Sequence, residues 1–509
     1  MTDPTPEPGR GPDDPDYTDP LTADDILARA GADQDGGKSA GGDTQASRLV
    51  ALANRRYRVL RGEDGRLYAT ELDGPALAYN LRGRDALRTR LARLYYDTHG
   101  QTPNGGALSD ALTVLEGQAE HTDPTPVALR VAAAAGGRVV LDLGTADGTF
   151  VVIGPDGWQL APRSPVLFRR SALTAPMPEP TRGGGSLDPL RRLLNVDETG
   201  FRLIVAWLVA ALVPDIPHPI LCLSGEQGTA KSTAVRLVVS LVDPSPAPLR
   251  TPPTEMRSWA AAASASWVVA LDNVSSVPAW FSDTLCKAVT GDGIVERALH
   301  TDDDINVLTF RRCIALTTID AGRLAGDLAE RLLPVELDRI PTEQRRPDAE
   351  IADHYDTARP GLLGALLDLT AQMLAALPAV RLAELPRMAD FARILGALDH
   401  VCSWDTLATY TAATRDAARA VLDADPVAQA VCALVAQRPW QGTHDELLGV
   451  LTPLRPGRDW PKTPRGLAGR LKRLAPALRN EGVIYEHGRR QQNRMITLRS
   501  DRHARPTTW

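Results

Sequence analysis

The sequence predicts an α/β fold, and three observations lead to this prediction. An apolar run at 220–224 is followed by a glycine-containing loop and then by a helical pattern over 234–239. A second apolar run, at 266–271, ends next to an acidic residue and follows a helical stretch over 256–263. Strand and helix patterns keep alternating up to about residue 345, which is typical of a parallel sheet covered by helices.

The loop after the first apolar run has the residues that a phosphate-binding P-loop needs. Glycines let backbone N–H groups turn towards phosphates, and the N-terminus of the following helix adds positive potential. Lys231 is expected to reach the β- and γ-phosphates of ATP, and the Ser232 hydroxyl to hold Mg²⁺. The residues predicted to bind the nucleotide are Gly225, Gln227, Gly228, Thr229, Ala230, Lys231, Ser232 and Thr233.

One position of this loop departs from the usual motif, which has glycine directly before the lysine. This chain has Ala230 there. An alanine N–H can still donate to a phosphate if the φ angle stays negative, so we expect a negative φ at this position. The lysine itself stands out, because only five of the 57 basic residues are lysine, at positions 38, 231, 287, 462 and 472. A bare glycine turn between a strand and a helix is the alternative interpretation.

The second apolar run ends at Asp272, 41 residues after Lys231. A carboxylate at the carboxyl end of a core strand can hold Mg²⁺ and its water shell, as in a Walker B strand. The next residue is usually a second acid that polarises the attacking water, and here it is Asn273. Fast hydrolysis would then need another carboxylate, such as Glu226 or Asp292. A buried strand with a capping aspartate is the alternative.

Length and composition limit the classes of protein that the chain can belong to. With 509 residues, 43% of them hydrophobic and 24% charged, it should form two to four soluble domains. No membrane span is expected, since the apolar run at 204–213 is too short to cross a bilayer. The N-terminus does not resemble a secretory signal, and the five cysteines form no C-x-x-C pair. A cytoplasmic location is the natural expectation.

The two ends of the chain carry opposite charge. Residues 1–45 contain 11 acidic against 3 basic residues, and residues 455–509 contain 14 basic against 4 acidic residues. We expect 1–45 to be a disordered acidic tail, with a short helix possible around 23–30. A basic C-terminal part suits a protein that meets nucleic acid, although a pair of solvated ends would look the same.

Residues 46–180 are predicted to form a strand-rich α+β domain. Two strand patterns at 57–60 and 67–69 flank Gly62 and Gly65, which indicates a hairpin. The glycines at 144 and 148 resemble a methyltransferase motif or a sugar-kinase phosphate loop, but the β-prone residues at 149–153 favour a β-meander over the helix that a methyltransferase requires. No function is assigned to this domain from its sequence.

After the second apolar run, a helix over 281–289 carries Lys287 and leads through Thr290-Gly291-Asp292 into a hairpin, 294–300 and 305–310, with an acidic tip. This order resembles the superfamily 3 helicases of phages, plasmids and poxviruses. In that family the hairpin lines the channel of a ring and grips DNA. The resemblance implies an AAA+-like ATPase core over 187–345, DNA contacts from Lys287, Arg297 and His300, and a homo-oligomeric ring. A structural hairpin with a solvated tip is the alternative.

The same resemblance assigns two further roles. The strand pattern at 311–318 corresponds to the family's sensor strand, where Thr318 would orient water or the γ-phosphate. Arg331 stands before a final apolar strand, where the family has an arginine finger that reaches the neighbour's nucleotide. An ordinary Arg–Glu surface pair is the alternative for Arg331.

The last two predicted domains are helical and mixed. Residues 346–425 read as a helical lid or bundle packed on the ATPase core, with the clearest helix at 362–377 stopped by Pro378. A separate helical domain without contact to the nucleotide is the alternative. Residues 426–500 read as a winged helix, followed by a tail at 501–509. Its third helix, 464–475, should end at Pro476. The residues expected to contact DNA are Arg465, Lys472 and Arg473 on this helix, and Arg489, Arg490 and Arg494 at the tip of the wing.

The sequence therefore predicts an ATP- and Mg²⁺-dependent DNA motor, resembling superfamily 3 helicases and encoded by a mobile genetic element. Catalytic roles are expected for Lys231, Asp272, Asn273, Thr318 and Arg331. The second interpretation is a DNA-bound ATP switch that does not translocate, which Asn273 and the acidic hairpin tip favour. A third, a small-molecule kinase or methyltransferase, rests on residues 139–148 alone.

Overall fold

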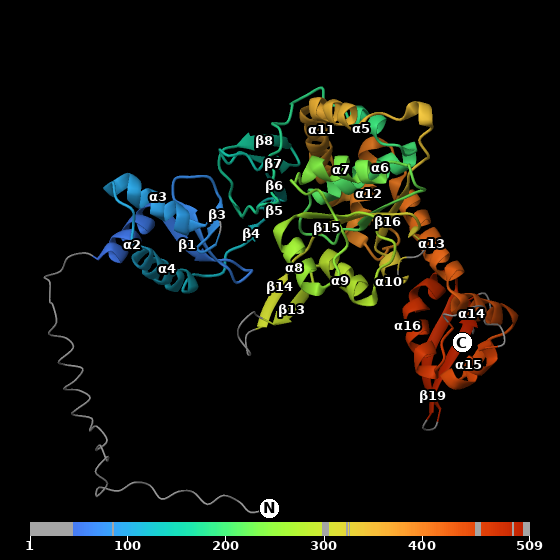
Figure 1. Cartoon of the computed structure of the whole chain (residues 1–509). Coiled ribbons are helices and arrows are strands. Elements are labelled where there is room, and N and C mark those ends of the chain that lie inside the picture. Colours follow the sequence, from blue (N-terminus) through green and yellow to red (C-terminus); the bar gives the residue numbers. More distant parts are fainter. Residues whose placement is uncertain are drawn as a thin grey trace, which may run out of the picture.

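The computed structural model describes residues 44–83, 86–297, 305–321, 324, 326–452, 460–490 and 493–501 (Figure 1). Positions 1–43 of the predicted acidic tail, including the short helix expected around 23–30, lie outside the described residues. Its predicted end at 45 is slightly too late, because a helix already begins at Gln45 and is capped by the Thr44 side chain.

The first folded unit is a three-stranded antiparallel sheet with three helices. Its elements are α2 (Gln45–Arg56), β1 (Tyr57–Arg61), β2 (Leu67–Glu71), β3 (Ala78–Asn80), α3 (Leu87–His99) and α4 (Gly105–Glu120). The predicted hairpin is confirmed, since β1 pairs with β2 in antiparallel register. The unit has a hydrophobic core of its own, in which Leu49, Leu91 and Leu112 are completely buried.

A second group of strands follows and forms the predicted β-meander. Its strands are β4 (Val127–Ala128), β5 (Val131–Ala134), β6 (Arg138–Asp142), β7 (Phe150–Gly154), β8 (Gly157–Ala161) and β9 (Leu167–Phe168). Strands β5 to β8 pair in sequence order, each antiparallel to the next. The turn between β6 and β7 holds Gly144 and Gly148 at positive φ, 70° and 73°, and leads into a strand instead of a helix.

The centre of the molecule is a five-stranded parallel sheet in the order β11-β12-β15-β10-β16. Its elements are α5 (Asp188–Leu193), α6 (Glu198–Ala211), β10 (Ile220–Ser224), α7 (Lys231–Val242), β11 (Leu249–Arg250), α8 (Met256–Ala265), β12 (Val268–Leu271), α9 (Ala279–Thr290), β15 (Cys313–Thr318), α10 (Gly326–Ala329) and β16 (Leu332–Glu336). The antiparallel pair β13 (Gly293–Arg297) and β14 (Ile305–Thr309) extends from this body, beside α8 and α9 in Figure 1.

Alternation along β10 shows how the sheet is covered on both faces. Leu221 and Leu223 belong to the core that contains α6, α7 and the long helix α11, whereas Ile220 and Cys222 belong to the core that contains α8 and α9. A strand that is apolar at every position is what a sheet buried on both faces requires. The predicted α/β fold with a parallel sheet is confirmed.

The first of these two cores extends beyond the parallel sheet. It includes residues of the β-meander, among them Leu141, Val151 and Ile153. The predicted boundary near residue 180 therefore does not separate two hydrophobic cores, and the meander packs as part of the central body.

The helices after the sheet are η2 (Thr342–Gln344), α11 (Asp348–Ala376), η3 (Leu377–Ala379), α12 (Ala389–Cys402) and α13 (Thr406–Ala424). The helix predicted at 362–377 is longer than expected, because α11 begins at Asp348 and continues through Pro360. Within the described residues, 348–379 is the one helical stretch long and apolar enough to cross a membrane, but half of its most apolar part is buried inside the protein. A core helix of a soluble protein passes the same test.

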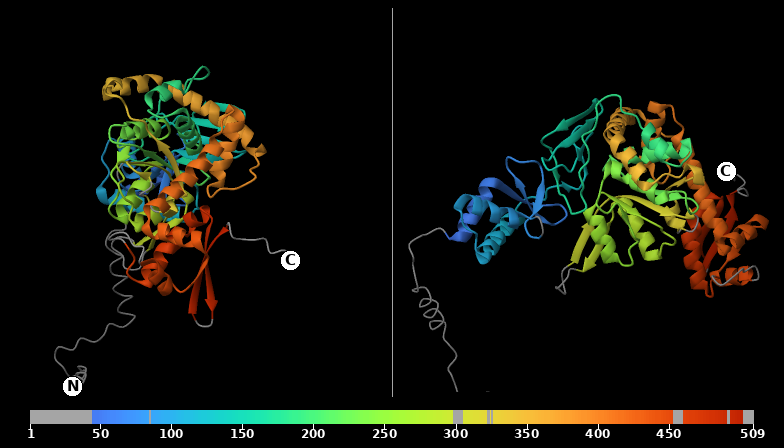
Figure 2. Two further views of the ribbon diagram at one scale, coloured as in Figure 1. Left: turned by 90° about the vertical axis from the view of Figure 1, so that its right-hand side faces the viewer. Right: turned by 45° about the horizontal axis from the view of Figure 1, so that its top comes forward.

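The C-terminal unit has the elements α14 (Pro426–Gln437), β17 (Trp440–Gly442), α15 (His444–Leu451), α16 (Pro464–Asn480), β18 (Val483–Arg490) and β19 (Asn493–Ser500) (Figure 2). The three strands form an antiparallel sheet in the order β17-β19-β18. The three predicted helices and the terminal hairpin are all present, on a core that includes Val431, Leu467 and Leu471.

Two predictions about this unit are wrong. Pro476 does not end α16, which continues to Asn480 because Ala477 and Leu478 bury their side chains in the core. This burial offsets the backbone hydrogen bond that proline cannot make. The strands of the predicted wing are also longer than expected, so Arg489, Arg490 and Arg494 belong to β18 and β19, in the last pairs before the turn at the tip.

Candidate functional site

The P-loop connects the end of β10 to the start of α7. Gly225 has φ 149°, and a Cβ atom there would lie 2.8 Å from the Leu337 carbonyl oxygen, so no larger residue fits without displacing the backbone. Gly228 has φ 83°, a conformation that favours glycine. The loop is tied down by Thr229, which is almost completely buried and donates its hydroxyl to the Glu226 carbonyl at 3.0 Å.

The expectation of a negative φ at Ala230 is wrong. Ala230 has φ 59° and ψ 31°, which is the left-handed region. The loop must reverse direction directly before the helix, and in the usual motif glycine makes this turn without steric cost. For an alanine the same conformation costs about 1–2 kcal/mol. The backbone of the P-loop is therefore kept, with strain at the position where glycine is missing.

The Lys231 amine folds back onto its own loop. Its Nζ donates hydrogen bonds to the carbonyl oxygens of Gly225 at 2.7 Å and Glu226 at 2.6 Å. Partial burial lowers the pKa of Lys231, and the nearby Asp272 carboxylate opposes this shift. A cation held over the centre of the loop can exchange these carbonyls for phosphate oxygens.

The P-loop helix and the acidic strand meet at one carboxylate. Ser232 Oγ, in the first turn of α7, donates to both oxygens of Asp272, at 2.8 and 3.0 Å. Sheet register produces this meeting: Ser224 is level with Thr318 and Leu271 with Leu316, so the residues that follow β10 and β12 emerge at the same edge. The structure thus brings together the two residues that the sequence predicts for Mg²⁺.

Thr317 is a member of this group that sequence reasoning missed. Its hydroxyl donates to Asp272 Oδ1 at 2.6 Å and accepts a hydrogen bond from the Asn273 backbone N–H at 2.7 Å. The predicted sensor residue, Thr318, instead bonds locally, accepting from the Asp320 N–H at 3.3 Å. Side chains alternate between the two faces of a sheet, so only one of two neighbouring threonines can lie on the face that carries the Asp272 carboxylate, and the sequence does not show which.

Asn273 is exposed and has φ 55°. Asparagine tolerates the left-handed region better than most residues, so its backbone conformation is understandable at the sharp turn after β12. The two carboxylates named as substitutes for a second acid are elsewhere. Glu226 is exposed in the P-loop, and Asp292 accepts a hydrogen bond from Thr290 after α9. No described contact joins either of them to Asp272.

Arg331 lies at the opposite edge of the sheet from the P-loop. Its carbonyl accepts the N–H of Ile220, the first residue of β10, at 2.8 Å. The P-loop begins five residues after Ile220, so at about 3.3 Å per residue it lies roughly 16 Å away along β10. Neighbouring residues fix this position, since Ala329 is buried in the core of the C-terminal unit and Glu330 forms an ion pair with Arg387 at 2.6 Å.

A cavity of about 370 Å³ adjoins the P-loop, lined by Arg192, Leu193, Leu194, Asn195, Ile340, Glu343, Gln344, Arg345, Arg346 and Ile351. It lies between the segment before α6 and the segment after β16. Arg345 connects this cavity to the P-loop, because its Nη2 would be 3.5 Å from a Cβ atom on Gly228.

Of the remaining predicted nucleotide-binding residues, Gln227 is exposed and Thr233 is partly exposed.

The predicted DNA contacts are distributed over two surfaces. Lys287 is exposed on α9, directly before the β13–β14 pair, and Arg297 is the last described residue of β13. His300 lies outside the described residues. Arg465, Lys472 and Arg473 are all exposed on α16. Only the backbone is described for Arg489, Arg490 and Arg494.

Metal binding by protein side chains alone is not supported in the part of the chain that the structure describes. It contains no group of three or more His, Cys, Asp or Glu residues placed to hold a metal ion. Ser232 and Asp272 offer a hydroxyl and a carboxylate, which are the hard oxygen ligands that Mg²⁺ takes when phosphates and waters complete its shell. The donor set therefore fits Mg²⁺ bound together with a nucleotide.

Comparisons with known proteins agree with a role in replication. Residues 187–419 match the family of actinomycete integrative conjugative element replication proteins, and residues 427–507 match the C-terminal domain of the same proteins. A comparison with curated proteins found no match.

Two solved structures show a distant similarity to this chain. The apo structure of the NrS-1 C-terminal region is 12% identical, with a TM-score of 0.36, and the alignment covers 91% of this chain and 100% of that one. A JCV helicase structure is 11% identical, with a TM-score of 0.23, over 46% of this chain and 72% of that one. Both values are too low to support a functional argument. By its two family matches, over residues 187–419 and 427–507, this chain is similar to the replication proteins of actinomycete integrative conjugative elements.

Proposed function

We propose that this protein is an ATP-dependent DNA motor for the replication of a mobile genetic element, working in the cytoplasm as a ring of identical subunits. The single observation that carries the proposal is the contact between Ser232 and Asp272. It joins a phosphate-binding loop to an acidic strand at the edge of a parallel sheet where nucleotides bind in such folds. The family match to replication proteins supplies the biological setting.

Each part of the site has a defined task in this proposal. Backbone N–H groups of the loop and the N-terminus of α7 hold the phosphates, and Lys231 transfers its hydrogen bonds from Gly225 and Glu226 to phosphate oxygens. Ser232 and Asp272 would hold Mg²⁺, which neutralises charge on the phosphates when it is bound. Thr317 keeps the Asp272 carboxylate in place. The cavity beside Arg345 is the natural place for the base.

The position of Arg331 supports the proposed ring. Because it lies at the edge of the sheet away from its own P-loop, it can serve as an arginine finger only for a neighbouring subunit. We propose that α12 and α13 act as a helical lid and that the C-terminal unit is a winged helix. Its helix α16 presents Arg465, Lys472 and Arg473 to DNA, and the β13–β14 pair supplies the contacts of the channel.

A DNA-bound ATP switch that does not translocate is the second candidate. The observation that favours it is Asn273, which takes the place of the usual second acid, with no described carboxylate in contact with Asp272 as a substitute. Such a protein would bind ATP tightly and hydrolyse it slowly, and the nucleotide would control assembly on DNA.

The two candidates are separated by ATP binding and steady-state hydrolysis, measured with and without single-stranded DNA, beside the Lys231→Ala variant. For the motor we expect turnover that DNA stimulates and that the substitution abolishes, followed by unwinding of a forked duplex. Tight binding without turnover in any DNA condition would favour the switch. If the protein binds no ATP, both candidates are wrong.

A further inference from the structure

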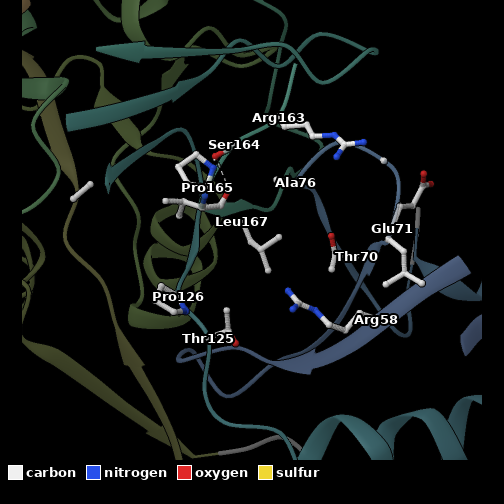
Figure 3. Close-up of a pocket in the computed structure, with 14 residues that line it drawn as sticks. Arg58, Thr70, Glu71, Ala76, Thr125, Pro126, Arg163, Ser164, Pro165 and Leu167 are labelled. Carbon is white, nitrogen blue, oxygen red and sulfur yellow. Dashed lines mark hydrogen bonds between the residues drawn. The ribbon is translucent and has the colours of Figure 1, made fainter. Parts of the chain in front are cut away.

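The N-terminal part of the chain contains a cavity that the proposed motor does not use. It has a volume of about 490 Å³ and lies where the first folded unit meets the β-meander (Figure 3). Arg58 comes from β1, Thr70 and Glu71 from β2, Thr125 from the connection before β4, and Arg163 and Ser164 from the connection before β9. Figure 3 shows Arg58 and Arg163 on different sides of this cavity, with Thr70 between them.

The charge of this cavity is positive and not compensated. The side chains of Arg58 and Arg163 make no hydrogen bond or ion pair to the described residues, and both residues are exposed. The carboxylate in the lining, Glu71, already pairs with Arg56 at 3.4 Å and with Arg90 at 3.8 Å. Two guanidinium groups therefore line the same cavity without a carboxylate paired to either of them.

A hydroxyl lies in the same space. Thr70 is only 5% exposed, yet its side chain makes no hydrogen bond to a described residue. The hydroxyl oxygen itself keeps access to the cavity, although most of the residue is buried. It is therefore free to donate a hydrogen bond to an oxygen-rich ligand there.

The chemistry of the lining points to phosphate. Arginine binds phosphate through paired N–H groups, and a hydroxyl adds a further donor. None of the described residues that line the cavity is aromatic, so the site has no platform on which a base could stack. We propose that this cavity is a binding site for a phosphate group, provided either by the backbone of a DNA strand or by a free nucleotide. The inference does not depend on the P-loop.

The test compares two double variants of the full-length protein. Arg58→Ala/Arg163→Ala removes both cations of the cavity. Arg55→Ala/Arg138→Ala is the matched control, since both of these arginines are exposed, lie outside the cavity and have no described partner. Thr70→Val is a third variant, which keeps the shape of the side chain and removes only the hydroxyl. Thermal melting checks that each variant is folded.

Two probes distinguish the sources of phosphate. Fluorescein-labelled dT12 is titrated at several salt concentrations, and inorganic tripolyphosphate is titrated by calorimetry; the P-loop is the same in all variants, so its own binding cancels. If DNA is the source, the cavity variant binds dT12 at least fivefold more weakly than the control. Its salt slope should be smaller by about 1.4, the value for two contacts to a single strand.

The remaining outcomes also decide the question. Unchanged dT12 binding with the loss of one tripolyphosphate site would identify free nucleotide as the source. Thr70→Val should weaken whichever probe is affected, by about fivefold. Equal binding of both probes by the cavity variant and the control would overturn the inference, whatever the ATPase assay shows.

Discussion

At the scale of single residues, Ala230 tests whether the P-loop carries strain. Replacing Ala230 by glycine removes the cost of a left-handed alanine, about 1–2 kcal/mol. Glycine also gives the unfolded chain more conformational entropy, which stabilises the unfolded state by about 0.4–1 kcal/mol. We expect the free energy of unfolding of Ala230→Gly to rise by about 0.5–1 kcal/mol. Chemical denaturation measures this change.

The control for Ala230→Gly is the same substitution in an ordinary helix. Ala234 is buried in α7, one turn further on, where glycine should lower the free energy of unfolding by about 1 kcal/mol or more. The two variants should therefore change stability in opposite directions. If both lower it, the positive φ at position 230 costs nothing.

His218 makes stability depend on pH. It is buried before β10, where its Nε2 lies 3.0 Å from the Ala210 carbonyl and 2.9 Å from the Val213 carbonyl, and burial lowers its pKa from 6.5 to about 4. The unfolded chain then binds more protons than the folded protein between about pH 4 and 6.5. The contribution of buried, neutral His218 to the free energy of unfolding is complete above pH 6.5. It decreases as the pH falls, by up to about 1.4 kcal/mol per pH unit.

The His218→Gln variant isolates this effect. At neutral pH it should be less stable than the wild type, and the difference between their urea midpoints should shrink from pH 7 to pH 4.5. A difference that stays constant over this range would mean that His218 does not titrate in the way its burial implies.

At the scale of elements, one buried ion pair joins the β-meander to the end of the P-loop helix. Arg130 before β5 donates to Asp243 at 2.8 Å, and the two side chains are 1% and 7% exposed. Asp243 directly follows the P-loop helix, and its other oxygen accepts the N–H groups of Trp267 and Val268 at the start of β12. One carboxylate thus links the meander, α7 and the acidic strand.

Removing one partner of this pair should be costly. Arg130→Met leaves Asp243 buried without its cation, and we expect the free energy of unfolding to fall by about 3–5 kcal/mol. The surface pair Arg82–Glu116 offers a matched control, since Arg82→Met should cost no more than about 1 kcal/mol. Urea denaturation of both variants gives the comparison, and similar losses would contradict a special role for Arg130.

Helix α8 forms a second connection between the β-meander and the central body. Its last carbonyls accept hydrogen bonds from outside the helix: Ala262 from Arg250, Ala263 from Arg312, Ser264 from Arg169 and Ala265 from Ser171. Two of these donors come from the segment after β9. The arginine side chains at the C-terminal end of α8 also interact favourably with the negative pole of its helix dipole. The meander is therefore held against the edge of the central body, which makes coupling between the two parts physically possible.

At the scale of the whole molecule, the proposed ring predicts complementation. Lys231→Ala removes the P-loop cation and Arg331→Ala removes the finger, so each variant alone should lose ATPase activity. In a mixed ring, some interfaces combine an intact P-loop from one subunit with an intact finger from the other. Mixing the two variants should restore part of the activity, measured as phosphate release.

Two controls complete this experiment. Each single variant alone, at the same total concentration, gives the baseline ATPase activity. A double variant with both substitutions should restore no activity when it is added to either single variant. If mixed rings stay as inactive as the separate variants while native mass spectrometry shows that subunits exchange, Arg331 does not act on a neighbour's nucleotide.

The sequence by itself determined the elements of this protein and the order in which they follow. The strand, loop and helix around Lys231, the acid at 272 and the three C-terminal helices were predictable because each depends on residues close together in the chain.

The sequence did not determine where α16 ends, because Pro476 is tolerated only where the following residues are buried. Only the tertiary structure decided that Thr317 and not Thr318 holds Asp272, since this depends on which of the two side chains shares a face of the sheet with the Asp272 carboxylate. The same holds for Ala230, whose φ is imposed by the join between β10 and α7, and for the partnership of Arg130 with Asp243, which lie 113 residues apart. Contacts over such distances arise from packing, and no local pattern encodes them.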